Sequence, residues 1–188
     1  MNLIGKPIQQ HLSMMKLWES DMIAYKLFNY KNNKLYPLYI DTENDIPLGK
    51  VLVAKAGQIT DSGKVKSKLG ELAFRPGWHC CEIPLADHIG KKQPNGKLYQ
   101  RKDHVWCEVE IPGETDYTEI AKNGKANSRD AYLKTIPTNG YYWYQTNPNA
   151  KIRWLISGEI KVNRILTNEE VTDLCHKAGF EPQRISEI

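Results

Sequence analysis

The stretch HVWCEVEI at residues 104–111 is the clearest indicator of how this chain folds. Its odd-numbered positions carry Val, Cys, Val and Ile, whereas positions 106, 108 and 110 carry Trp, Glu and Glu. Such strict alternation places the two sets of side chains on opposite faces of a β-strand. The stretch therefore predicts a strand, and the chain is expected to be built around the sheet that contains it.

Further strands are expected on both sides of this one. β-rich runs at residues 25–30 and 35–40 flank the turn KNNK at residues 31–34. Because asparagine tolerates a positive φ, the two runs are predicted to form a hairpin. Pro37 has no N–H to donate to a strand ladder, which favours an edge position for the second strand. Additional strands are predicted at residues 50–56, 141–146 and 152–166, the last one broken near Gly158.

Helices are expected at the two ends of the chain. Leu12, Met15, Trp18 and Met22 recur at helical spacing, which predicts an amphipathic helix over residues 11–23. Near the C-terminus, Thr167 and Glu170 have the spacing of a capping box, and Gly179 marks the end of the helix. A short helix is expected within residues 112–139, and the glycine- and lysine-rich residues 57–70 are expected to form a long mobile loop.

These patterns favour the α+β class, because strands dominate and regular βαβ alternation is absent. We expect a single domain over residues 1–188, with a mostly antiparallel sheet, an N-terminal helix and a C-terminal helix. Within it, residues 1–23 form the helical N-terminal segment and residues 24–180 form the α+β core. A chain of 188 residues is long enough to bury one good hydrophobic core without further cross-links.

The composition is that of an ordinary globular protein: 40% hydrophobic and 26% charged residues, with a mean hydropathy of −0.57. This composition excludes disorder of the whole chain. The sequence also contains no apolar run of membrane-spanning length. The first ten residues lack the apolar region of a secretory signal, so a cytoplasmic location and no membrane partner are expected. The oligomeric state leaves no trace in the sequence.

The four cysteines, at positions 80, 81, 107 and 175, form no disulfide framework and are expected to be free, mostly buried thiols. The residues that could donate to a metal fit no recognised zinc spacing, so no metal and no cofactor is expected. Those residues are His79, Cys80, Cys81, His88, His104 and Cys107.

Positive charge is concentrated in the middle of the chain. Residues 50–103 hold eleven Lys or Arg and five Asp or Glu, a net charge of +6, against +4 for the whole chain. Such a block can meet nucleic acid or an acidic protein surface, although a solvated lysine-rich face has the same composition. The residues predicted to contact a partner are Lys64, Lys66, Lys68, Arg75, Trp78, Lys91, Lys92, Arg101 and Lys102.

The segment RPGWH at residues 75–79 is the strongest candidate for chemistry. Two histidines and a cation can cleave RNA without a metal, with one base, one acid and a positive charge near the phosphate. His79, His88 and His104 are the candidate catalytic residues, and the alternative is that they are satisfied within the fold.

The aromatic run YYWY at residues 141–144 lies near Lys151 and Arg153 in the sequence. Such a run could stack on bases or line a small-molecule pocket, or half of its rings could belong to the core.

Several blocks in order resemble small proteins encoded by prophages and other mobile elements, over most of residues 25–175. The resemblance implies phage or plasmid cargo that counters host defence, such as an anti-CRISPR protein that binds an RNA-guided nuclease or competes for its nucleic acid. The chain is then expected to bind and inhibit a host nuclease complex. The blocks are YKLF at 25–28, LYPL at 35–38, IPLG at 46–49, RPGWH at 75–79, VWCEVE at 105–110 and IKVNRIL at 160–166.

A more distant resemblance is to the ADP-ribosyltransferase fold, on residues 77–89 and on the strand at 105–112. That fold carries a catalytic glutamate at a late strand, where this chain has Arg153 before residues 154–156, and Glu159 would have to substitute. A positive side chain cannot stabilise an oxocarbenium-like centre as a carboxylate would. The fold resemblance and the histidine pattern together leave one alternative function open, an ADP-ribosyltransferase-like or metal-independent RNase-like enzyme that uses His79.

Overall fold

The strand predicted from the alternating stretch is present with the predicted bounds, as β9 (His104–Ile111). The computed structural model describes residues 22–124, 131–146 and 149–187. Residues 11–21 of the expected N-terminal helix lie outside this part, and Met22 and Ile23 open strand β1 instead. The other elements are β1 (Met22–Lys31), β2 (Lys34–Tyr36), β3 (Val51–Val53), β4 (Val65–Ser67), β5 (Gly70–Leu72), β6 (Trp78–Cys81), β7 (Lys91–Lys92), β8 (Leu98–Tyr99), β10 (Thr115–Asp116), α1 (Thr118–Asn123), β11 (Gly140–Tyr144), β12 (Trp154–Ser157), β13 (Glu159–Ile165) and α2 (Asn168–Lys177).

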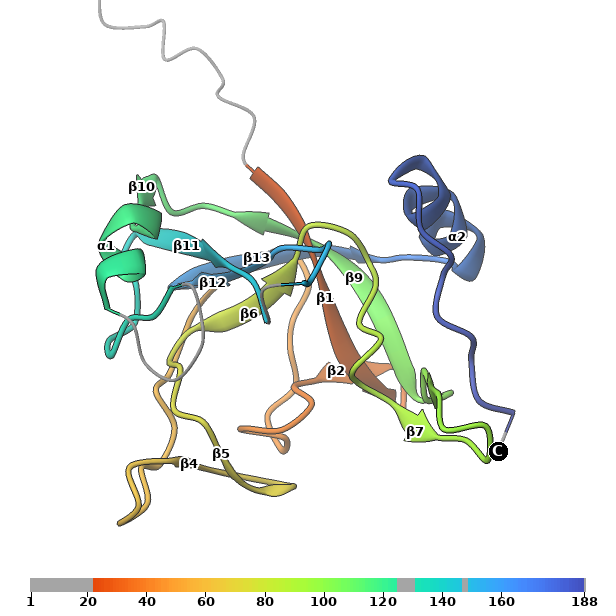
Figure 1. Cartoon of the computed structure of the whole chain (residues 1–188), viewed down its shortest axis with the longest axis horizontal. Coiled ribbons are helices and arrows are strands. Elements are labelled where there is room, and N and C mark those ends of the chain that lie inside the picture. The colour runs from red at the N-terminus through yellow and green to blue at the C-terminus, as the bar shows by residue number, and fades with distance from the viewer. Residues whose placement is uncertain (1–21, 125–130, 147–148, 188) are drawn as a thin grey trace, which may run out of the picture.

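One large sheet organises the molecule, in the order β10-β11-β12-β6-β1-β9-β13-β3, with β2 added to β1 (Figure 1). Among the strand pairs of this sheet in the described residues, only β10–β11 is parallel. This arrangement confirms the predicted α+β class with a mostly antiparallel sheet. Gly158 alone joins β12 to β13, although three strands separate them in the sheet order, so the sheet must curl.

The curled sheet has a core on each face. Neighbouring residues on one strand alternate between the two cores: Phe28 and Cys80 belong to the inner one, and Leu27 and Cys81 belong to the outer one. The inner core is filled by small and aliphatic side chains with one phenylalanine, whereas the outer core contains two tryptophans and two tyrosines. Both faces are therefore buried over the centre of the sheet, and all four cysteines are free and buried.

The predicted first hairpin is confirmed. Asn32 and Asn33 have φ values of 52° and 60°, and Lys31 pairs with Lys34 across the turn. This two-residue turn with positive φ at both positions matches the twist of the flanking strands. Among the named strands β2 pairs only with β1, but it is shorter than the predicted run at 35–40 and ends before Pro37, and Leu35 also forms a bridge with Ile46.

The prediction of a loop over residues 57–70 is wrong in one respect, because β4 and β5 form a hairpin there. Val65 supplies the reason: it is 3% exposed and pairs with Ile59, which gives the polar segment an apolar anchor. A second small hairpin, β7–β8, lies within the stretch from Gly90 to Asp103. The strands of both hairpins are too short to show the alternation of apolar and polar residues that would predict them from the sequence.

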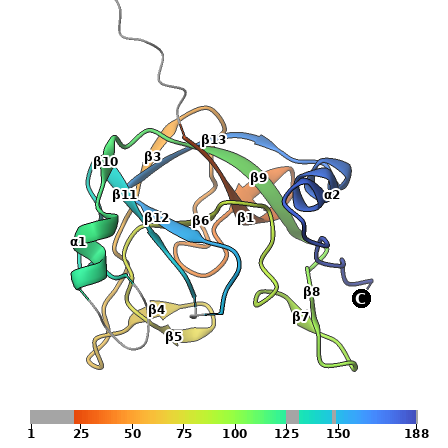
Figure 2. The ribbon, with the colours of Figure 1, turned by 45° about the horizontal axis from the view of Figure 1, so that its top comes forward.

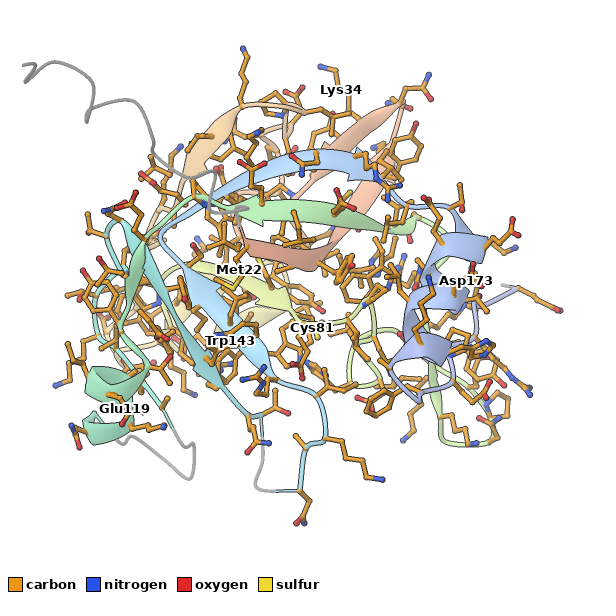
Figure 3. All side chains as sticks on the ribbon, turned by 90° about the horizontal axis from the view of Figure 1, so that it is seen from above. Met22, Lys34, Cys81, Glu119, Trp143 and Asp173 are labelled. Carbon is orange, nitrogen blue, oxygen red and sulfur yellow. The ribbon has the colours of Figure 1, made fainter. Side chains whose placement is uncertain are left out.

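The two helices lie at opposite ends of the sheet, with Glu119 on α1 and Asp173 on α2 (Figure 3). The capping box predicted for α2 is present: the Thr167 hydroxyl accepts from the Glu170 N–H at 3.2 Å, and the Thr167 N–H donates to the Glu170 carboxylate at 2.8 Å. Across residues 22–124, 131–146 and 149–187, no helix has the length and apolar character needed to cross a membrane.

Candidate anion-binding surface

The two small hairpins extend from the same side of the main sheet, as two arms (Figures 1 and 2). They are far apart in the sequence, one formed by β4 and β5 and the other by β7 and β8. The two arms contain the lysines at 64–68 and the cations at 91–102, which both belong to the basic block 50–103. The fold therefore brings these two basic stretches to one side of the protein.

The β7–β8 arm carries most of the charge. Residues 91–102 contain five cations and no carboxylate. The cations are Lys91, Lys92, Lys97, Arg101 and Lys102, and all five are exposed. Charges of one sign so close together repel one another in the free protein, and an anionic partner relieves that repulsion.

The C-terminal segment holds the β7–β8 arm in place. The Gln183 side-chain amide donates to the carbonyls of Ile89 and Leu98, at 2.8 and 3.0 Å. The backbone of Gln100 exchanges hydrogen bonds with Arg184 and Ser186, at 2.8 and 2.7 Å. These bonds fix the base of the arm, so its cations have a defined position relative to the sheet.

Three of these cations surround one surface hollow of about 240 Å³. Lys91 comes from β7, whereas Arg101 and Lys102 come from the turn that precedes β9. The fourth lining residue is Asp103, whose carboxylate accepts from Arg101 Nε at 3.0 Å. The pKa of Asp103 lies below its ordinary value: partial burial raises it, and the hydrogen bond and charge of Arg101 outweigh that effect. The hollow thus keeps a net positive charge.

The β4–β5 arm is basic but more nearly balanced. Lys64 lies 4.0 Å from the Glu71 carboxylate, and hydrogen bonds from Ser62 and Thr60 help to lower the pKa of Glu71. Lys66 and Lys68 are exposed. This arm therefore contributes a weaker positive surface than the β7–β8 arm.

The RPGWH segment builds part of the sheet. Gly77 has a φ of +134°, and a Cβ there would lie 2.3 Å from Ile156 Cγ2, so only glycine fits this entry into β6. The Trp78 indole N–H donates to the Leu52 carbonyl at 3.0 Å, which ties the edge strand β3 to β6. Trp78 and Lys26 lie together on the inner face, where the Lys26 ammonium is 5.5 Å from the indole. Trp78, predicted as a partner contact, is thus engaged within the fold.

His79 lies on the outer face, and its ring nitrogens face Arg75 and Tyr144. Its Nε2 lies 2.9 Å from the Arg75 carbonyl, which can only accept, so Nε2 carries the proton. In the neutral form of the ring Nδ1 is then the acceptor, and it faces the Tyr144 hydroxyl at 3.5 Å. A histidine in this state has one basic nitrogen, and that nitrogen faces a buried tyrosine.

The Arg75 guanidinium lies over the Tyr144 ring, with Cζ 5.0 Å from the ring centroid. Its Nε and Nη1 are buried and have no hydrogen-bond partner among the residues that the structure describes. The Tyr142 hydroxyl is also buried, and burial raises the pKa of Tyr142 to about 12. This cluster could hold an anion, because buried guanidinium nitrogens without a hydrogen-bond partner are costly.

The other two candidate histidines lie elsewhere. His88 packs edge-on against Trp154, with ring centroids 5.2 Å apart, and its Nδ1 is 3.7 Å from the Asp87 carboxylate. His104 opens β9 and is 7% exposed, and burial lowers its pKa below the ordinary value. His104 is therefore neutral at physiological pH. The contacts described for the three histidines involve three different sets of neighbours.

The aromatic run on β11 alternates as expected for a strand. Tyr142 and Tyr144 are buried in the outer core, whereas Tyr141 and Trp143 are partly exposed. The Arg153 guanidinium stacks on the Trp143 ring at 4.5 Å and pairs with Glu82 at 3.1 Å. Half of the run therefore serves the core, and one exposed ring is already covered by an arginine.

The sequence prediction missed Lys97 and Gln183. Lys97 is exposed on the β7–β8 arm, and the uninterrupted positive charge of residues 91–102 could have identified it. Gln183 anchors that arm from more than 80 residues away, for which the sequence offers no signal. No group of three His, Cys, Asp or Glu side chains suited to a metal is found in the described part of the chain.

The chain matches no protein-family model, and comparisons with curated proteins and with solved structures give no match.

Proposed function

We propose that this protein binds the sugar–phosphate backbone of a nucleic acid within a host nucleoprotein, and that the β7–β8 arm makes the main contact. The convergence of Lys91, Arg101 and Lys102 on one hollow carries the proposal. A phosphate group in this hollow would meet two lysines and one arginine, the side chains that bind phosphate best. Its charge would relieve the mutual repulsion of these cations.

The second arm supports the same proposal. The β4–β5 arm, whose residues include the exposed Lys66 and Lys68, extends from the same side of the sheet as the β7–β8 arm (Figure 2). An extended polyanion could contact both arms, whereas a single small anion would need only one. Nucleic acid is the polyanion with regularly spaced phosphates, and such contacts give affinity without reading the base sequence.

The biological role that we propose is counter-defence. The resemblance to mobile-element proteins favours a target such as an RNA-guided nuclease, which exposes nucleic acid within a positively charged protein. A basic protein that covers the guide or the target strand would block that complex. In a cleavage reaction, the protein should then slow the nuclease, and variants that lack the arm's charge should not.

The direct experiment compares two charge variants. One replaces three exposed lysines of the arm and its base, Lys92→Gln, Lys97→Gln and Lys102→Gln. The matched control replaces three exposed lysines elsewhere, Lys31→Gln, Lys134→Gln and Lys177→Gln, which changes the net charge equally. Binding to labelled single-stranded RNA, single-stranded DNA and duplex DNA is measured by fluorescence anisotropy at one salt concentration.

We expect the arm variant to lose most of its affinity and the control to keep nearly all of it. Equal losses in the two variants would show that only net charge matters, and the arm would then have no special role. An unchanged affinity in the arm variant would contradict the proposal outright.

A second candidate function is an enzyme that uses His79, favoured by the two buried nitrogens of the nearby Arg75 guanidinium that have no hydrogen-bond partner among the described residues. The cation would stabilise a developing negative charge, and His79 Nδ1 would accept a proton. His79→Ala separates the two functions. An enzyme would lose turnover of RNA or of an ADP-ribose donor and keep its binding, whereas a binding protein that uses the arms would keep its affinity and have no turnover to lose.

A further inference from the structure

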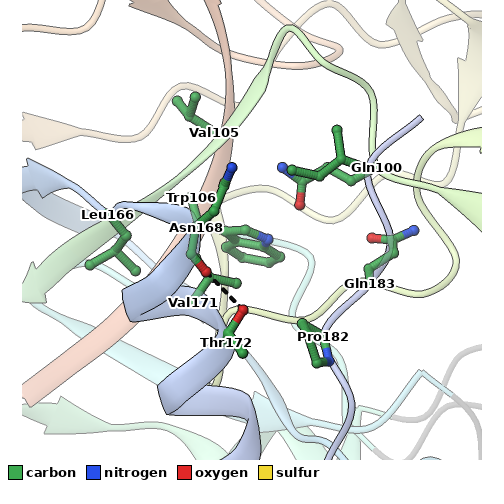
Figure 4. A pocket seen from close by; sticks show the side chains of 10 residues that line it. Gln100, Val105, Trp106, Leu166, Asn168, Val171, Thr172, Pro182 and Gln183 are labelled. Carbon is green, nitrogen blue, oxygen red and sulfur yellow. Dashed lines mark hydrogen bonds between the residues drawn. The ribbon is translucent and has the colours of Figure 1, made fainter. Parts of the chain in front are cut away.

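A small cavity lies between β9, α2 and the C-terminal segment, apart from the basic arms' hollow (Figure 4). Its volume is about 90 Å³. A buried water needs only about 10–15 Å³ measured in this way, so the cavity has room for a group of several atoms. The lining residues are Gln100, Val105, Trp106, Leu166, Asn168, Val171, Thr172, Pro182, Gln183 and Ile185.

Two buried polar atoms that line this cavity lack a hydrogen-bond partner. One is the donor Nε1 of Trp106, and the other is the acceptor Oε1 of Gln183, both within the described part of the chain. Figure 4 shows the indole nitrogen on the side that faces Gln183, and the amide oxygen of Gln183 turned toward the indole. An unpaired buried donor and an unpaired buried acceptor are each costly, and here both could be satisfied from one cavity.

The orientation of the Gln183 amide is fixed by its other end. Nε2 donates both of its protons, to the carbonyls of Ile89 and Leu98. Carbonyl oxygens only accept, so exchanging the nitrogen and oxygen would place oxygen against oxygen twice. Oε1 must therefore be the atom that faces the cavity. The Trp106 side chain is held as firmly, because the residue is 2% exposed within the outer core.

The walls restrict what can enter. Leu166, Val171 and Pro182 are apolar, and no side chain that lines the cavity is charged. A carboxylate could accept from the indole but has no proton for Gln183, and an ammonium could donate but not accept. Either ion would also lose its hydration with no opposite charge to replace it. A neutral group that accepts on one side and donates on the other satisfies both atoms.

We propose that this cavity is a binding site for a neutral primary carboxamide. The carbonyl oxygen of the ligand accepts from Trp106 Nε1, and its NH₂ group donates to Gln183 Oε1. Asn168 is exposed and lies among the lining residues, and the Thr172 hydroxyl donates to the Asn168 carbonyl at 2.8 Å. The cavity thus reaches the surface beside the first turn of α2, which gives the carboxamide a way in.

A carboxamide can come from a small molecule or from an asparagine or glutamine side chain. Both sources present the same carboxamide group, and two probes distinguish them. Acetamide represents the free group, and N-acetyl-glutamine methylamide represents a side chain attached to a backbone. Acetone, which can only accept, and acetate, which is charged, are the controls.

The experiment follows the indole N–H signals of the full chain by ¹H–¹⁵N NMR, with the Trp106 signal assigned through bonds. The chain has five tryptophans, so the other four signals report on non-specific effects. We expect either carboxamide to shift the Trp106 signal selectively and saturably, with a dissociation constant on the order of millimolar to tens of millimolar for so few atoms. Acetone and acetate should shift it at least about tenfold less at the same concentration.

Two substitutions on α2 test the location. Thr172→Met fills the cavity and should abolish the response, whereas Asp173→Met adds the same side chain at an exposed neighbouring position and should leave it intact. A response that Thr172→Met leaves unchanged would overturn the proposal. So would equal shifts with acetone and acetamide, or no saturable shift with either carboxamide, which would mean that the cavity holds water only.

Discussion

Replacing Gly77 with alanine tests how the RPGWH segment enters the sheet. The new Cβ would lie 2.3 Å from Ile156 Cγ2 and 3.0 Å from the Ser157 carbonyl oxygen. Ile156 is fully buried, so its methyl group cannot move into solvent. Overpacking of this kind costs about 1–3 kcal/mol. The φ of +134° adds strain of about 1–3 kcal/mol for any residue with a side chain. Gly77→Ala should thus lower the free energy of unfolding by about 2–6 kcal/mol.

The matched control is Gly96→Ala, at the turn of the β7–β8 arm. Gly96 also has a positive φ, +79°, but nothing lies within 4 Å of its added Cβ. Gly96→Ala should therefore lower the free energy of unfolding only through its backbone strain, by about 1–2 kcal/mol. Urea denaturation followed by tryptophan fluorescence gives both values, provided that the slope with denaturant is unchanged. If Gly77→Ala costs no more than Gly96→Ala, the close contact between Gly77 and Ile156 is refuted.

Three further predictions concern buried groups and the C-terminal helix. Burial lowers the pKa of His104 below 6.5, so as the pH falls through 6.5 the unfolded chain takes up a proton that the folded chain does not. The free energy of unfolding should therefore decrease as the pH falls. The urea midpoints at about pH 8 and about pH 5 should differ less in His104→Gln than in the natural protein, and an equal difference would contradict this. Thr167→Ala removes the α2 cap and should lower the free energy of unfolding by about 1 kcal/mol in urea denaturation, whereas no loss would mean that the capping box is not formed. Burial raises the pKa of Cys80 to about 11, and all four thiols are buried, so a disulfide reagent such as DTNB should react only after urea is added; rapid reaction in the native protein would contradict their burial.

The elements with a legible local pattern could be predicted from the sequence. The strand at 104–111 has a period of two, the KNNK turn has two residues that accept a positive φ, and Thr167 and Glu170 form a capping box. In each case the physical cause lies within a few residues, so the sequence alone contains it.

The sheet order could not be predicted, because it depends on contacts between distant segments. β1 lies between β6 and β9, and β12 and β13 are neighbours in sequence but not in the sheet. The hairpins within 57–72 and 91–99 have strands of two or three residues, too short to reveal a period. Their apolar anchors, such as Val65, become visible only when the partner is known.

The candidate site was predicted in part. Charge density identified the two basic stretches, and the fold places both on one side. The sequence could not separate the lysines from Trp78 and Arg75, which lie against Leu52 and Tyr144 within the fold. The same limitation applies to Gln183, whose importance comes entirely from its two long-range hydrogen bonds.

The central claim is that the β7–β8 arm binds the phosphates of a nucleic acid, and the salt dependence of binding tests it most directly. For each protein, the logarithm of the binding constant is measured against the logarithm of the salt concentration on one duplex or single strand. The slope counts the phosphates neutralised. We predict a steep slope for the natural protein and for Lys31→Gln/Lys134→Gln/Lys177→Gln, and a slope smaller by about 2–3 for Lys92→Gln/Lys97→Gln/Lys102→Gln. A flat response in the natural protein, or the same slope in all three proteins, would contradict the account.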